Sequence, residues 1–115
     1  MSRTHEIPRE QWTSFFGAVA KTEYDRRVRI ELDEEGLGSQ PHAEPMPFIG
    51  LALEKRGSDD VDVTVRVGEG GDFEHRIAGA HRLVALEGDD GDLRVLDIES
   101  TNGGDHAVHT RVYFE

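Results

Sequence analysis

Every second residue is a valine in Val61-Asp62-Val63-Thr64-Val65-Arg66-Val67, and polar residues fill the alternate positions. Successive side chains of a β-strand point to opposite faces, so this alternation predicts a strand with one buried and one solvated face. Such strands are typical of antiparallel sheets, which pack one face on a core. We therefore expect the neighbouring segments to supply further antiparallel strands.

The alternation recurs on both sides of these valines. Strands are predicted at residues 28–32, 49–53, 73–77, 82–87, 93–99 and 107–114. Short turns rich in glycine and aspartate separate the later strands, which favours meander connections. Residues 33–47 hold three of the four prolines and are predicted to form a long loop that is either mobile or functional.

A helix is predicted before the first strand. Pro8 suits a first helical position, and the apolar residues that follow are spaced as on one face of a helix. These residues are Trp12, Phe15, Phe16 and Val19. The predicted fold is α+β in a single domain, residues 1–115. It has an N-terminal amphipathic helix packed on a twisted antiparallel sheet of six or seven strands, with a half-barrel as one form of that sheet.

Two of the late strands are apolar on both faces. They contain Leu83-Val84-Ala85-Leu86 and Leu93-Arg94-Val95-Leu96. Each face of such a strand must be covered. The second face is expected either inside a curled sheet or against a second subunit. An exposed patch around Leu83, Ala85, Leu93 and Val95 would favour a second subunit.

Composition excludes several classes of protein. The chain has 115 residues, no cysteine and a net charge of −11. A field of this sign repels phosphate backbones, so nucleic acid is not expected as a partner. The chain shows no signal peptide and no apolar run long enough for a membrane span, so a soluble, cytoplasmic protein is expected. Its only lysines are Lys21 and Lys55, against eleven arginines, which fits either a salt-adapted source or a GC-rich genome.

Histidine and arginine supply the candidate site residues. His75 lies between Phe73 and Ile77 on the predicted apolar face, as either a core histidine or an imidazole that lines a pocket. His106 and His109 lie three apart on a strand and so point to opposite faces, with His109 on the face of Arg111 and Tyr113. We expect both histidines to be solvated, and no metal site is predicted there. The basic cluster of Arg26, Arg27 and Arg29 would either grip an anion or pair with acids on neighbouring strands. No catalytic set and no cofactor are predicted.

The chain resembles a family of small bacterial proteins classed as a domain of unknown function. The likeness rests on five segments that occur in the family's order, with Gln11 in place of the usual acid. These segments are Ile7 to Trp12 followed by Phe15-Phe16, Leu37-Gly38-Ser39-Gln40 with Ala43-Glu44, Met46 to Leu51, Glu74-His75-Arg76-Ile77, and Asp97 to Thr101. The family carries no assigned activity, so the resemblance implies no catalytic role. It directs attention to Gln40, Glu44 and His75.

Two functions follow as hypotheses. The first is a non-enzymatic binding or protein-interaction module that associates with itself as a homodimer or with another protein. The alternative is a small-ligand or enzymatic pocket centred on His75 with Gln40 and Glu44, in which the proline-rich loop brings two polar side chains beside a strand histidine.

Overall fold

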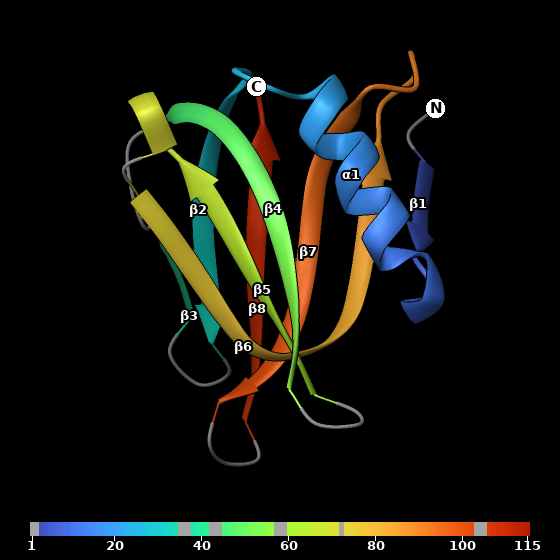
Figure 1. Ribbon diagram of the computed structural model, residues 1–115, viewed down its shortest axis with the longest axis vertical. Coiled ribbons are helices and arrows are strands. Elements are labelled where there is room, and N and C mark those ends of the chain that lie inside the picture. The colour runs from blue at the N-terminus through green and yellow to red at the C-terminus, as the bar shows by residue number, and fades with distance from the viewer. Residues whose placement is uncertain (1–2, 35–37, 42–44, 57–59, 72, 103–105) are drawn as a thin grey trace.

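A computed structural model of the protein describes residues 3–34, 38–41, 45–56, 60–71, 73–102 and 106–115. One α-helix, two short 3-10 turns and a single antiparallel sheet make up this part of the chain (Figure 1). The helical elements are η1 (Arg9–Gln11), α1 (Trp12–Thr22) and η2 (Glu69–Gly71). The strands are β1 (Arg3–Glu6), β2 (Arg27–Glu34), β3 (Gly38–Pro41), β4 (Met46–Arg56), β5 (Asp60–Val67), β6 (Phe73–Glu87), β7 (Leu93–Asn102) and β8 (His106–Phe114).

The sheet closes into a barrel. Its strands pair in the order β6-β5-β4-β2-β8-β7, and β7 pairs again with β6. From β4 to β8 each strand pairs with the next along the chain, which is the expected meander. Two short strands extend the described sheet, β1 beside β6 and β3 beside β2. The sheet therefore curves further than the half-barrel considered from the sequence, and it closes because β2 pairs with both β8 and β4.

The core fills the barrel. All four valines of β5 are buried, and Val63 and Val65 have no exposed surface. α1 packs against β4, and its residues Trp12, Phe16 and Val19 join the same core cluster. Trp12 also donates a hydrogen bond from Nε1 to the carbonyl oxygen of Ile7, 2.8 Å away. The predicted amphipathic helix and its apolar stripe are thus confirmed.

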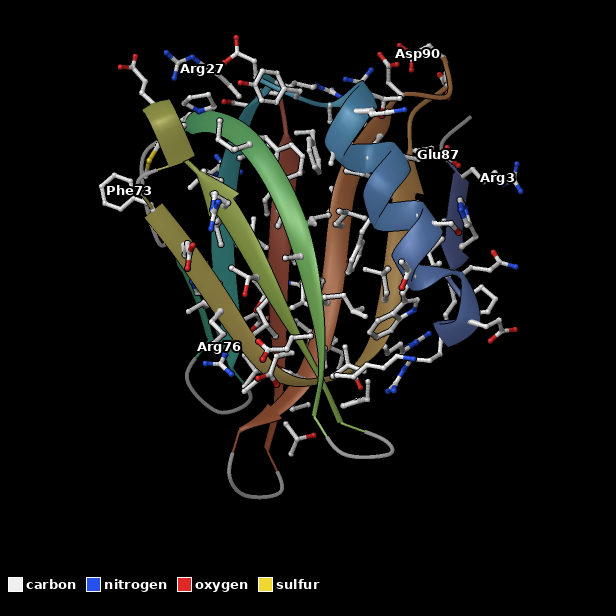
Figure 2. All side chains as sticks on the ribbon, in the orientation of Figure 1. Arg3, Arg27, Phe73, Arg76, Glu87 and Asp90 are labelled. Carbon is white, nitrogen blue, oxygen red and sulfur yellow. The ribbon has the colours of Figure 1, made fainter. Side chains whose placement is uncertain are left out.

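A corner in β6 makes the closure possible. The first half of this long strand pairs with β5 and the second half pairs with β7. The pairing register shifts where the two halves meet, at the β6 residues that lie opposite Asp62 of β5. Gly79 adopts φ +66° there, a conformation that glycine reaches without strain. Asp62 is only 2% exposed, and its carboxylate accepts hydrogen bonds from the Gly79 backbone N–H (3.2 Å) and from Arg76 (2.6 Å). Figure 2 shows Arg76 just before the bend.

The contact between Arg76 and Asp62 has an electrostatic consequence. The hydrogen bond that Arg76 donates to Asp62, reinforced by the charge of the carboxylate, raises the pKa of the Arg76 guanidinium above its ordinary value. The buried carboxylate of Asp62 thus has a positive counter-charge beside it, since a guanidinium in a protein stays protonated. The corner combines a permissive glycine with a charged side chain that fixes the backbone around it.

A second anchor holds the ends of three strands together. Arg26 precedes β2 and donates hydrogen bonds to the carbonyl oxygens of Glu115 (2.8 Å) and Leu93 (2.8 Å). Its guanidinium also lies 3.2 Å from the carboxylate of Glu23 and 5.6 Å from the ring centroid of Phe114. One side chain thus ties the start of β2 to the start of β7 and the end of β8.

Three features differ from the sequence-based prediction. The segments predicted as separate strands at 73–77 and 82–87 are one strand, because the bulge at Gly79 bends β6 without ending it. The predicted loop at 33–47 contains the end of β2 and all of β3. β1 was not predicted, because Arg3-Thr4-His5-Glu6 is polar throughout and shows no apolar alternation.

We expect Asp62→Ala to lower the free energy of unfolding by about 2 kcal/mol, because it removes the acceptor of a backbone N–H in a part-buried corner. Urea denaturation followed by circular dichroism measures this change. Asp62→Asn keeps an acceptor for Gly79 and should lose less. An Asp62→Ala variant that unfolds at the same urea concentration as the original protein would show that the corner does not depend on this side chain.

We expect Arg26→Gln to lower the free energy of unfolding by about 2 kcal/mol, since it removes charge-assisted hydrogen bonds to carbonyl oxygens of two strand ends. Arg27→Gln is the matched control. It changes the net charge equally, but the Arg27 side chain is exposed and donates to the Pro45 carbonyl oxygen at 3.1 Å. Equal denaturation midpoints for the two variants would contradict the anchoring role of Arg26.

Candidate functional site

The two apolar faces of the late strands have different surroundings. Leu83, Ala85 and Leu93 point into the barrel and are buried. Val95 points outward and is half-buried. An exposed patch around these four residues would have favoured a second subunit, but three of them are buried because the closed barrel covers that face from within, so the argument from that patch no longer applies. The opposite face of the same strands, which includes Val84 and Leu86, forms the outer surface.

An apolar surface lies on the outside of β1, β6, β7 and β8. Cross-strand pairing brings Thr4 opposite Leu86, Leu86 opposite Val95, and Val95 opposite Tyr113. We call Thr4, Val84, Leu86, Val95 and Tyr113 the outer-face patch. These residues line a shallow hollow of about 290 Å³, together with Asp97 and Arg111 at one side. The hollow is thus apolar along its strands and charged at one border.

A network of charged side chains borders the patch. Arg111 donates hydrogen bonds to Asp33 (3.0 Å) and to Asp97 (3.4 Å). Burial lowers the pKa of Arg111, but hydrogen bonds and attraction from Asp33 and Asp97 outweigh that effect and leave it raised. His109 lies 2.9 Å from Asp97 through Nδ1 and 3.5 Å from Glu99 through Nε2. This border therefore joins β2, β7 and β8 by ion pairs.

The network continues toward β1. Arg82 donates to Glu6 at 2.6 Å and approaches Glu99 at 4.0 Å. The hydrogen bond and charge of Glu6 raise the pKa of Arg82. His81 lies 3.7 Å from Glu99. The side chains of Asp97 and Glu99 are only 26% and 22% exposed, so this part of the border is partly withdrawn from solvent.

The predicted pocket around His75 is described only in part. His75 lies on β6 opposite Val65, on the inward side of the strand, and is half-buried with an interaction partner. The backbone of Gln40 pairs with Leu32 between β3 and β2, but its side chain lies outside the described residues, as does Glu44. The pocket of His75, Gln40 and Glu44 stays a prediction.

The basic cluster is occupied by contacts within the protein. Arg26 binds carbonyl oxygens, Arg27 donates to Pro45, and the Arg29 guanidinium lies 5.0 Å from the ring centroid of Tyr113. Among the acidic partners considered from the sequence, the described residues show Glu23 beside Arg26. Arg29 instead stacks on the aromatic end of the outer-face patch.

His109 was expected to be a solvated side chain, and its place in the network corrects that. The sequence did place His109 on one face with Arg111 and Tyr113. It did not show that Asp97 and Glu99 of β7 lie beside His109, because pairing between two strands leaves no local pattern in either one.

Within the described ranges, no group of three or more histidine or acidic side chains is arranged to hold a metal ion.

The outer-face patch itself had a signal in the sequence. The runs at 83–86 and 93–96 are apolar at odd and even positions alike, and this pattern indicated a second covered face. These runs did not reveal which alternate residues of each strand point inward, so the sequence could not separate the residues of the outer face from those of the core.

No helix in the described part of the chain combines the length and apolar character that a membrane crossing requires.

Comparisons with known proteins agree with this architecture. An uncharacterised protein of Aquifex aeolicus (strain VF5) is 24% identical over 107 residues, which cover 87% of this chain and 85% of the relative. The crystal structure of the Bacillus subtilis YojF protein superimposes with a TM-score of 0.59 and 13% identity, covering 97% of this chain and 94% of YojF. That likeness shows a shared fold. The model of a family of unknown function, DUF5335, matches residues 3–113, and the chain belongs to this family.

Proposed function

We propose that the protein is a non-enzymatic interaction module that binds a second copy of itself through the outer-face patch. The observation that carries the proposal is the apolar row of Leu86, Val95 and Tyr113 on the outside of a barrel that already has a filled core. A strand face that is apolar without facing the core gains from burial against another surface.

The charges around the patch favour a second copy as the partner. The bordering residues carry both signs: the carboxylates of Glu6, Glu31, Asp33, Asp97 and Glu99 and the guanidinium groups of Arg29, Arg82 and Arg111. His81 and His109 lie among them. These five carboxylates and three guanidinium groups contribute −2 to the chain's net charge of −11. Both signs are therefore available at this border for pairing between two copies.

Symmetry adds to the argument. A twofold dimer uses the same surface on both subunits, so that surface must be complementary to itself. An apolar row with acids and arginines along its border suits this condition, because carboxylates of one copy can pair with guanidinium groups of the other. A strongly basic partner would instead favour a border of one sign.

We expect the protein to form a concentration-dependent dimer and Val95→Arg to abolish it, because the new guanidinium would be buried among apolar side chains. Sedimentation velocity over a concentration series measures the dissociation. Thr13→Arg adds the same charge at an exposed position of α1 and should leave the dimer intact. A Val95→Arg variant that dimerises as tightly as Thr13→Arg, with both folded by circular dichroism, would rule out this face.

A further inference from the structure

Most of the net negative charge lies outside the border of the outer-face patch. The chain carries 24 acidic and 13 basic side chains, a net charge of −11, to which the five carboxylates and three guanidinium groups of the border contribute −2. Exposed acids lie on elements that do not form the patch, such as Glu10 on η1, Glu54 on β4 and Glu69 on η2. When two copies meet at the patch, these charges repel one another across the dimer.

Dissolved salt screens the exposed acids away from the patch more strongly than it screens the ion pairs of the border. The Debye length falls from about 30 Å at 0.01 M salt to about 10 Å at 0.1 M. The radius of gyration is 13.5 Å, so exposed acids on two subunits lie more than about 10 Å apart, and their repulsion acts at low salt and is largely screened at 0.1 M. The ion pairs of the border join side chains within 4.0 Å and are partly buried, so they are screened much less.

We infer that ionic strength controls this self-association: the dimer is weak at low salt and tightens as salt is added. This inference rests on the proposed function and specifies how the same surface is regulated. Salt removes the long-range repulsion between subunits while the apolar row and the paired border remain available. Most interfaces that depend on charge attraction respond in the opposite direction, because salt weakens the attraction between their surfaces.

The test is the dimer dissociation constant in sodium chloride from low to molar concentration, measured by sedimentation velocity. We expect it to fall by about tenfold or more, which corresponds to about 1.4 kcal/mol. Two charge variants separate screening from a general salting-out of apolar surface. Glu10→Gln with Glu54→Gln and Glu69→Gln raises the net charge by three, and Lys21→Gln with Lys55→Gln lowers it by two.

The glutamate variant should dimerise at lower salt than the original protein, and the lysine variant should require more. All three proteins should converge at high salt. A dimer whose dissociation constant is independent of salt, or rises with it, overturns the inference and leaves the proposed function standing. So does a salt response that is identical in both charge variants. A protein that stays monomeric at every salt concentration, or a Val95→Arg variant that dimerises normally, overturns the proposed function itself.

Discussion

The buried carboxylate of Asp62 holds the corner on which the barrel depends. A strand that paired with β5 along its whole length could not also reach β7, and the sheet would stay open. The bulge at Gly79 turns β6 away from β5, and Asp62 binds the backbone of that bulge. A carboxylate is an effective clamp for this purpose, since it accepts from a backbone N–H and from a charged side chain at once. Closure, a filled core and an outer surface on β6 and β7 all follow from that turn.

In the closed barrel, the apolar residues of the late strands lie either in the core or on the outer surface. Leu83 and Ala85 complete the core, and Val84 and Leu86 cover the outside of the same strand. The outer residues gain little from the core, so the stability of the single barrel does not account for them. The charged network beside them is well paired and partly buried, which keeps this face ordered. These features underlie the proposal that the outer-face patch binds a second copy.

Much of the fold was predictable from the sequence. Period-two alternation identified the strands from β2 to β8 apart from β3, and helical spacing of Trp12, Phe16 and Val19 identified α1. β1 and β3 were not predictable, because these polar segments show no apolar alternation and their place in the sheet follows from backbone pairing with distant strands. Closure depends on Asp62 and Gly79, which are far apart in the chain. The pairing of His109 with Asp97 and Glu99 likewise arises only from the register between β7 and β8.

The bulge at Gly79 also bears on how the hairpin of β6 and β7 finds its alignment during folding. In most strands the hydrophobic pattern fixes the register, because a slip by one residue would turn polar side chains inward. Here a slipped β6 would offer Val84 and Leu86 to the interior in place of Leu83 and Ala85, so these four residues alone leave the register ambiguous. The same slip would turn Arg82 inward, which is costly. Arg82 and the bulges between β6 and its neighbours therefore set the register that an apolar run cannot set by itself.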